Sequence, residues 1–523
     1  MKRSCIVVAM FIFGVVSLLA QDGTLDVTFS SDGKATAAVS SADDDFGQAL
    51  AIQPDGKIVM AGVYFSGFSS HIGLLRLNKN GTPDTGFDGD GIVTVSIGTS
   101  GSSANGIALQ DDGRIVVVGT AESGGRDVFA VLRFNSNGTP DASFDGDGIV
   151  LTPVQEKYDA GNTIVIQEDG KIVVGGKSYA NSNMDFTLIR YLPNGSLDTT
   201  FDHDGIVTTP VSAGYDEIKS LALQTDGKIV SVGASYDEEK NKLSMVRYLP
   251  NGSLDTTFGN GGKVLESAAT GGQYVNSVAI QPDGRIVVAG DADVTVNHDI
   301  IVYRYTENGI LDKDFSGDGM VKMDFGTDDC YAQSVALQQD GKIVVVGHTF
   351  NGTDYDVAVL RLNSNGQFDT SFDGDAKVTV KTGTGGDYGK SVAIQPDGNI
   401  VIGGYATVGS KTDFAVIRLL STVPTSVETL HASDHISFEL LQNYPNPFNP
   451  STTIGFTLQA SGHTTLKIYD AVGREVVTLA NENLEAGVYH QRTFDAAKLT
   501  SGVYFARLQS GRSNQIRKML LMK

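Results

Sequence analysis

A repeat of constant length constrains this chain more than any other feature of its sequence. An Asp-Gly turn between two apolar runs recurs every 57 residues, at Asp55, Asp112, Asp169, Asp226, Asp283, Asp340 and Asp397. An Arg between apolar residues has the same period, at Arg76, Arg133, Arg190, Arg247, Arg304, Arg361 and Arg418. The motif Asp-x-x-Phe follows it, starting at Asp26, Asp84, Asp141, Asp198, Asp255, Asp312 and Asp369. Seven ordered copies of one unit predict a repeat architecture.

Each unit contains four short segments with strand composition. In the fifth unit these are Ser277–Gln281, Arg285–Ala289, Ile300–Tyr305 and a segment that begins at Met320. A tight turn around Asp283 joins the first two, with glycine at the position that needs a positive φ. No segment shows a sustained helical period, so the repeat predicts an all-β fold.

A closed ring and an open solenoid both stack such units, and the ends of the array favour the ring. The array starts at Asp22 with the last part of a unit, and it stops after Leu420 without that part. Residues 22–420 together equal seven repeat lengths. We therefore predict a seven-bladed β-propeller with four strands per blade over residues 22–420. In this fold the N-terminal strand around Lys34–Val39 completes the last blade.

The repeat also resembles a known family. The run SVAIQPDGRIVVAG, residues Ser277–Gly290, followed by NG-x-LD-x-x-F, is similar to the delta-60 family of propeller repeats. The resemblance implies the propeller architecture. It implies no reaction, because the family as a whole has none assigned.

The first 20 residues are typical of a secretory signal peptide. A basic start, Met1-Lys2-Arg3, precedes the apolar run Cys5–Ala20, which is too short for an ordinary membrane span. Cleavage there would leave Cys330 as a lone cysteine. We expect it to be an ordinary residue in an interblade loop, with a reactive thiol as the alternative.

The net charge of the chain indicates which classes of partner it can bind. The formal net charge is −22, which argues against nucleic acid, since phosphate binding needs clustered Lys and Arg. No other stretch is long and apolar enough to cross a bilayer, so we expect no transmembrane segment after cleavage. An acidic surface favours a monomer.

The repeat ends before a different C-terminal region. Residues 421–439 are interpreted as a linker, and residues 440–523 as a small Ig-like β-sandwich of six or seven short strands. Its pieces NYPNPFNPSTTI, IYDAVGREV, SGVYFARL and the tail RKMLLMK resemble the type A sorting domain of the type IX secretion system. The resemblance implies entry to the periplasm, passage across the outer membrane by the type IX machinery, and release or attachment at the cell surface.

Asp-Gly-Asp-Gly loops are the first candidates for chemistry. They occur at residues 88–91 and 145–148, with Asp202-His203-Asp204-Gly205 in the third repeat. Calcium is one interpretation, but the spacing departs from the EF-hand and the fourth unit lacks these carboxylates. Side-chain capping of the turn is favoured.

The sequence shows no recognisable catalytic site. The repeated Arg and Asp occur once per unit, which indicates an ion pair of the scaffold. The eight His residues lack metal-ligand spacing, and neither a nucleophile elbow nor a phosphate-binding Gly loop is present. We therefore predict no catalytic, cofactor-binding or metal-binding residues, and a non-enzymatic role is favoured.

One repeated position does vary. Seven residues before each turn Asp, a polar residue enters the first strand of the unit. If that strand is the innermost, these side chains form a ring at one mouth of the channel, suited to an asymmetric ligand: Gln48, Asn105, Asn162, Lys219, Asn276, Gln333 and Lys390. The alternative is a solvated rim of the scaffold.

Three functions follow from these features. The leading hypothesis is an exported binding or interaction propeller whose ligand, a glycan or a protein, is unknown. The second is an extracellular lyase or hydrolase that acts on glycans or peptides, which would need a non-repeated acid, base or metal cluster at one rim. The third is a structural or adhesive component of the cell surface.

Overall fold

The computed structural model describes residues 22–421 and 438–522. Short gaps within these ranges are residues 41–42, 99–100, 156, 181–182, 238–239, 267–270, 295–296, 327–328, 441–442, 444–447, 449, 485, 487–488 and 512. The chain divides into two compact units, residues 1–421 and 422–523, which are described separately. The predicted signal peptide and residues 422–437 of the predicted linker lie outside the described residues.

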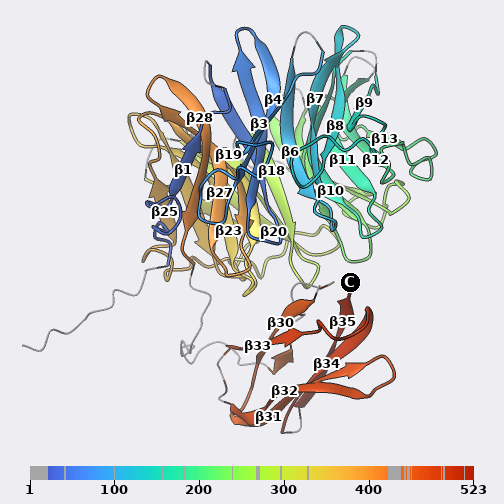
Figure 1. The fold of residues 1–523 in the computed structure, drawn as a ribbon, viewed down its shortest axis with the longest axis vertical. Helices are drawn as coiled ribbons and strands as arrows, with labels where there is room; N and C mark the ends of the chain where they lie inside the picture. The colour runs from blue at the N-terminus through green and yellow to red at the C-terminus, as the bar shows by residue number, and fades with distance from the viewer. Residues whose placement is uncertain are drawn as a thin grey trace, which may run out of the picture. The chain divides into compact units, whose positions relative to one another are not determined.

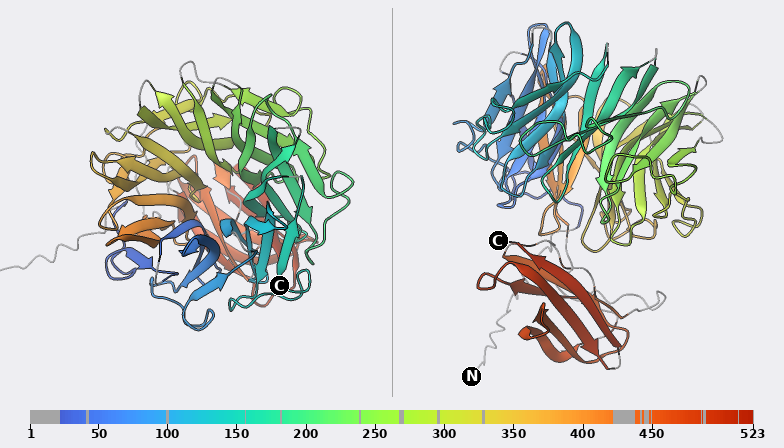
Figure 2. Two further views of the ribbon diagram at one scale, coloured as in Figure 1. Left: turned by 90° about the horizontal axis from the view of Figure 1, so that it is seen from above. Right: turned by 90° about the vertical axis from the view of Figure 1, so that its right-hand side faces the viewer.

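The first unit is a ring of seven four-stranded antiparallel sheets (Figures 1 and 2). Six sheets follow chain order from the first strand to the fourth, and the seventh has the order β26-β27-β28-β1, which confirms the prediction of a seven-bladed propeller. First strands contact the first strands of both neighbouring blades around the whole ring, and β26 contacts β2. The first strand is therefore the innermost, as the interpretation of the polar ring required.

The two inner strands of the blades have closely similar lengths. The first strands, in blade order, are β2 Asp45–Ile52, β6 Ser102–Leu109, β10 Asp159–Ile166, β14 Asp216–Leu223, β18 Gln273–Ile280, β22 Cys330–Leu337 and β26 Asp387–Ile394. The second strands are β3 Ile58–Ser66, β7 Ile115–Ser123, β11 Ile172–Ala180, β15 Ile229–Tyr236, β19 Ile286–Val294, β23 Ile343–Phe350 and β27 Ile400–Val408.

The outer strands show the split of the last blade. The third strands are β4 Ser69–Leu77, β8 Arg126–Phe134, β12 Asn183–Tyr191, β16 Asn241–Tyr248, β20 Asn297–Tyr305, β24 Tyr355–Leu362 and β28 Lys411–Leu419. The fourth strands have four residues each: β5 Ile92–Val95, β9 Ile149–Thr152, β13 Ile206–Thr209, β17 Lys263–Glu266, β21 Met320–Met323, β25 Lys377–Val380 and, in blade 7, β1 Lys34–Ala37.

Strand β1 closes the ring. It pairs antiparallel with β28, with Lys34 opposite Ile417 and Ala37 opposite Phe414. Phe29 and Ala35 are buried in the core that joins blade 7 to blade 1. The predicted completion of the last blade by the N-terminal strand is confirmed.

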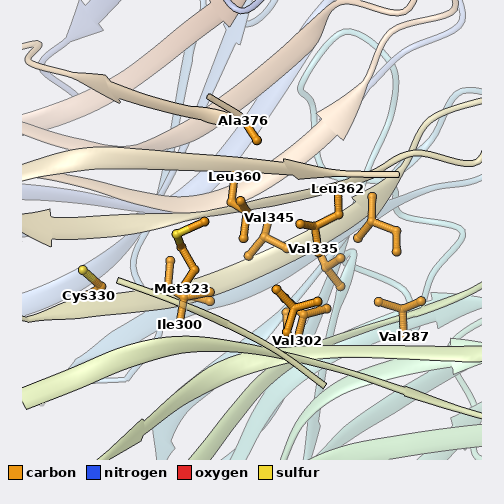
Figure 3. Close-up of a cluster of buried hydrophobic side chains, with 14 of the residues drawn as sticks. Val287, Ile300, Val302, Met323, Cys330, Val335, Val345, Leu360, Leu362 and Ala376 are labelled. Carbon is orange, nitrogen blue, oxygen red and sulfur yellow. The ribbon is translucent and has the colours of Figure 1, made fainter. Parts of the chain in front are cut away.

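Apolar cores lie between neighbouring blades. The core between blades 5 and 6 packs Val287 and Val302 of one sheet against Val345 and Leu360 of the next (Figure 3). Because the middle strands are covered on both sides, they are unbroken apolar runs in the sequence.

Cys330 belongs to the core between blades 5 and 6. It is fully buried at the start of β22, with its Sγ 3.1 Å from Thr349 Oγ1. The prediction that it lies in an interblade loop is wrong.

The repeated Arg and Asp form a buried ion pair in every blade. Arg Nε lies 2.7–2.9 Å from the carboxylate of Asp-x-x-Phe. The guanidinium also lies 4.4–4.8 Å from the ring centroid of the motif's Phe. In six blades it also donates to a backbone carbonyl of the following blade, for example from Arg304 to Ser364. The scaffold role predicted for these residues is confirmed.

The same interactions hold the N-terminal segment. Arg418 pairs with Asp26 at 2.7 Å, and Arg361 donates to Asp22 Oδ1 at 3.0 Å. Both Asp residues come from the segment that precedes β1, whereas both Arg residues belong to the last two blades. The segment is therefore attached by buried ion pairs as well as by strand pairing.

The second unit is a β-sandwich of two antiparallel sheets. One sheet has the order β29-β30-β33 and contains β29 Glu439–Leu440, β30 Ser451–Thr457 and β33 Tyr489–Asp495. The other has the order β32-β31-β34-β35 and contains β31 Gly462–Asp470, β32 Glu475–Leu484, β34 Gly502–Ser510 and β35 Ser513–Leu521.

The segment that precedes β30 is hydrogen-bonded to the last strand of this sandwich. Phe448 donates to Leu520 O and accepts from Met522 N, and its side chain is buried in the core. Asn443 Nδ2 donates to Thr452 Oγ1 at 2.9 Å. No helix in the described part of the chain could span a membrane.

We predict that Arg418→Ala lowers the free energy of unfolding by about 3–5 kcal/mol, because it leaves the Asp26 carboxylate buried without its cation. Arg114→Ala is the matched control: Arg114 is 37% exposed, and its pairs with Asp112 and Asp141 should contribute less than about 1 kcal/mol. Urea unfolding of both variants measures the difference. Equal losses would contradict the proposed attachment.

Candidate functional site

Each predicted ring residue is the extra residue of a β-bulge in its first strand. In blade 1, Gly47 pairs with Gly62 and Ala49 pairs with Ala61, so Gln48 has no partner across the ladder. The same register shift occurs at the equivalent position in every blade. A bulge re-aims a side chain, and here it places seven polar side chains around the axis.

The bulge requires a glycine in the second strand. A Cβ added at Gly290 would lie 1.9 Å from Tyr274 O, and one at Gly233 would lie 1.9 Å from Glu217 O. The equivalent position in the other five blades is also glycine, with the same close approach: Gly62, Gly119, Gly176, Gly347 and Gly404. The repeated glycine is therefore the sequence signal of the bulge.

All seven ring residues line one axial cavity of about 340 Å³. The following residues of the first strands complete its lining, among them Ser220, Ser277, Ser334 and Ser391. Each ring side chain is half-buried. Sequence reasoning placed these residues together, although a ligand contact stays a prediction.

Part of the ring is used to join blades. Three ring amides donate to a backbone carbonyl of the next first strand at 2.8 Å: Asn105 to Gly161, Asn162 to Ile218 and Asn276 to Ala332. The serines after the bulge accept a backbone N–H from the next blade, as Ser391 does from Leu50 at 3.2 Å. These hydrogen bonds between neighbouring first strands give the three Asn residues a scaffold role. The other four ring residues, Gln48, Lys219, Gln333 and Lys390, make no such bond to the backbone of the next strand among the described residues.

The blades differ from one another just outside the ring, on the side where the first strands begin. The position two residues before each ring residue carries Phe46, Ser103, Ala160, Glu217, Tyr274, Tyr331 and Tyr388 in blade order. Its cross-strand partners are Val63, Thr120, Lys177, Ala234, Asp291, His348 and Tyr405. Blades 5, 6, 7 and 1 are thus aromatic here, while blades 2, 3 and 4 are not.

The aromatic residues form one connected arc. Successive ring centroids are 4.8–5.6 Å apart along the series Tyr274, His298, Tyr331, His348, Tyr388, Tyr405 and Phe46. We call these seven residues the aromatic arc. Most of its side chains are half-buried, so they combine interblade packing with a partly exposed surface.

A charged cluster occupies the opposite part of the rim. Glu217 is buried and pairs with Lys177 at 3.0 Å and with Lys219 at 2.8 Å. It also accepts from Asn162 and Tyr215 at 2.9 Å. Burial acts to raise the pKa of Glu217, but the Lys219 and Lys177 charges outweigh it and hold the pKa at about 2. This carboxylate is therefore ionised at neutral pH.

A second non-repeated cluster joins the arc to the ring. His298 Nδ1 lies 3.0 Å from Asp291 Oδ2, and His298 Nε2 lies 3.2 Å from Asp293 Oδ1. Asp291 Oδ1 lies 3.4 Å from the amide of the ring residue Asn276. Burial raises the pKa of Asp291 to about 6, and the hydrogen bond to Asp291 raises the pKa of His298.

Sequence reasoning missed these clusters. It found no non-repeated acid or base at a rim, and the structure corrects this at Glu217 and at the Asp291–His298 pair. Their members lie in different strands, so no spacing in the sequence marks them. In an alignment of the seven repeats, Glu217 departs from the other units in the first strand, before the Asp-Gly turn, whereas Asp291 and His298 depart in the second and third strands, after it.

The Asp-Gly-Asp-Gly loops show the predicted turn capping. Asp90 Oδ1 accepts from Ile92 N at 2.8 Å, and Asp147 and Asp204 cap their turns in the same way at 2.9 Å. Among the described residues, no group of three or more His, Cys, Asp or Glu is arranged to hold a metal ion. Calcium binding by these loops stays a prediction.

We predict that the two histidines of the arc titrate differently. His298 should titrate above 6.5, so its contribution to stability is present below that pH and lost as the pH rises through the folded-state pKa. Burial, with the Lys390 charge, lowers the pKa of His348 to about 3, so this imidazole should be neutral at neutral pH. Imidazole NMR signals followed against pH measure both.

Asp291→Asn is the test of the cause. It should lower the pKa of His298 and leave His348 unchanged, which makes His348 the internal control. An unchanged His298 midpoint would show that Asp291 does not stabilise the protonated imidazole.

Family models match both units of the chain. A domain of unknown function, the DUF5122 β-propeller, matches residues 53–87, 110–144, 167–201, 224–258, 281–315, 338–372 and 395–422. A secretion system C-terminal sorting domain matches residues 442–522. No curated protein sequence matches the chain.

Solved structures also match the chain, at low identity. Sqt1 from Chaetomium thermophilum is 12% identical, with a TM-score of 0.37 over 75% of this chain and 98% of that one. The polysaccharide lyase Uly1 is 10% identical, with a TM-score of 0.42 over 72% and 90%. A putative glycoside hydrolase from Parabacteroides distasonis is 12% identical, with a TM-score of 0.26 over 49% and 85%.

The matched repeats span residues 53–422, and the expected delta-60 and type IX resemblances are confirmed. The sorting domain indicates export across the outer membrane to the cell surface or the medium. The chain therefore belongs to the DUF5122 β-propeller family and carries a type IX secretion system C-terminal sorting domain.

Proposed function

We propose that the protein is an exported binding propeller that holds its ligand at the axial cavity and the aromatic arc. The supporting observation is the unequal divergence of the two ends of the ring. Every blade has the same Arg, Asp and Phe interactions beside its Asp-x-x-Phe turn. The end that carries the arc differs from blade to blade.

A scaffold alone gives no reason for this difference. Repeats that only stack can keep one residue at each equivalent position, because every interblade interface has the same geometry. An asymmetric ligand instead needs different groups at equivalent positions. The cavity volume of about 340 Å³ lies within the range of small-molecule sites, about 300–1,000 Å³.

We predict that replacing two residues of the arc, Tyr388→Ala with Tyr405→Ala, weakens ligand binding at least about tenfold, since a few aromatic anchors dominate the binding energy of an interface. The experiment applies the full chain to an array of oligosaccharides and peptides and then measures affinity for the best ligand. Phe368→Ala, a 42% exposed aromatic beside an Asp-x-x-Phe turn, is the matched control and should bind normally.

Thermal unfolding of each variant separates lost binding from lost structure. Binding that survives in the folded double variant would place recognition elsewhere. Absence of binding to the whole array would favour the structural or adhesive role instead.

A second candidate is a glycan-acting or peptide-acting enzyme. The Asp291–His298 pair favours it, because a carboxyl with a pKa of about 6 beside an imidazole can transfer protons near neutrality. Mass analysis of each bound ligand after incubation tests this function. Turnover that is lost in Asp291→Asn while binding persists would support the enzyme over the binding protein.

A further inference from the structure

Lys219 and Lys390 are the two charged members of the ring. Lys219 belongs to blade 4 and Lys390 to blade 7, and both line the axial cavity. Lys219 is paired with Glu217 at 2.8 Å. They therefore bring positive charge into one small space from two sides of a seven-membered ring.

Lys390 has no anionic partner among the described residues. Its Nζ lies 3.3 Å from Gln333 Oε1 and 5.8 Å from the ring centroid of Tyr405. Burial, together with the Lys219 charge, lowers the pKa of Lys390. An ammonium group in this position is costly unless an anion accompanies it, so the cavity favours a negative group.

The charge balance of the rim supports this. Lys177 and Lys219 share the ionised carboxylate of Glu217, and Lys390 adds a third ammonium group on another side of the ring, in a chain of net charge −22. The Asp291 and Asp293 carboxyls near the ring are paired with His298, so they do not neutralise Lys390. The surrounding acidic surface would repel a polyanion. The charges therefore suit a ligand with one anionic group at its binding end.

The remaining lining suits a saccharide. The side chains of Gln48 and Gln333 offer amide donors and acceptors for hydroxyl groups. Next to the cavity but outside its lining, the half-buried Tyr405 ring beside Lys390 and the Tyr388 ring stacked on it at 4.8 Å offer partly exposed apolar surface for the C–H face of a sugar. A volume of about 340 Å³ accommodates a small end group better than a folded protein segment.

We infer that the ligand is an acidic saccharide, with one uronic-acid carboxylate bound between Lys219 and Lys390. This inference rests on the proposed binding function and specifies its ligand class.

The experiment compares matched ligands. The full chain is applied to uronic-acid-terminated oligosaccharides and to the same oligosaccharides after carboxyl reduction, which removes the charge and keeps the sugar. Peptides ending in Asp or Glu form the second arm. We expect binding to an acidic saccharide at least about tenfold stronger than to its reduced form.

Lysine variants locate the carboxylate. Lys390→Gln should abolish the preference for the acidic form, and Lys390→Arg should retain it. Because Lys390→Gln removes a half-buried charge that has no anionic partner among the described residues, it should fold at least as well as the parent chain. Lys313→Gln, at an exposed residue inside an Asp-x-x-Phe motif, is the control and should bind normally.

Equal binding of acidic and reduced saccharides would overturn this inference and leave the proposed function intact, provided that the arc variant loses binding. A preference for acidic peptides that depends on Lys390 would also overturn it, because the anion site would then serve another ligand class. Binding that is insensitive to both the lysines and the arc would overturn both proposals.

Discussion

Every blade buries an Arg guanidinium, and a buried guanidinium needs a carboxylate partner. The rest of the ring depends on this pairing. Arg247 is 1% exposed, pairs with Asp255, stacks on Phe258 and donates to the blade that follows. Burial would raise the pKa of Asp255, but hydrogen bonds from Thr257 and the Arg247 charge outweigh it and lower the pKa. One side chain thus fixes the turn within its blade and the distance to the next blade.

Because the Arg–Asp pairs stabilise the end of the ring with the Asp-x-x-Phe turns, the residues at the opposite end can differ from blade to blade. The interblade cores and the Arg–Asp pairs do not involve the residues of the aromatic arc or the Glu217 cluster. The bulge lies between the uniform end and the variable end of each blade. It depends on main-chain geometry and on a glycine, and not on a particular ring side chain. A blade can therefore exchange Asn for Lys or Gln at the axis without losing its sheet. Recognition and stability are carried by different residues of the same repeat.

The period of the sequence was sufficient to predict the blade count, the closing strand and the ring around the axis. It was insufficient for the bulge, because a bulge is a property of two paired strands and breaks the alternation that marks a strand. The prediction began the first strand of blade 5 at Ser277, whereas pairing continues back to Gln273. The same early start puts Cys330 within a strand.

The sequence did not predict the aromatic arc, for a different reason. Phe46 and Tyr405 are far apart along the chain, and their rings lie 4.9 Å apart only because the ring closes. Glu217 and Lys177 likewise belong to different blades. Contacts between repeats depend on ring closure, which a single repeat does not reveal.

The attachment of the N-terminal segment also sets the order in which the molecule can fold. Asp26 and Arg418 are 392 positions apart, so their pair can form only after the last blade has been made. Closing so long a loop costs entropy, although each doubling of its length adds only about 0.6 kcal/mol. Non-local pairing of this kind is slow. Until it happens, β28 keeps an unpaired edge, and a chain that ends before blade 7 has no route to a closed ring.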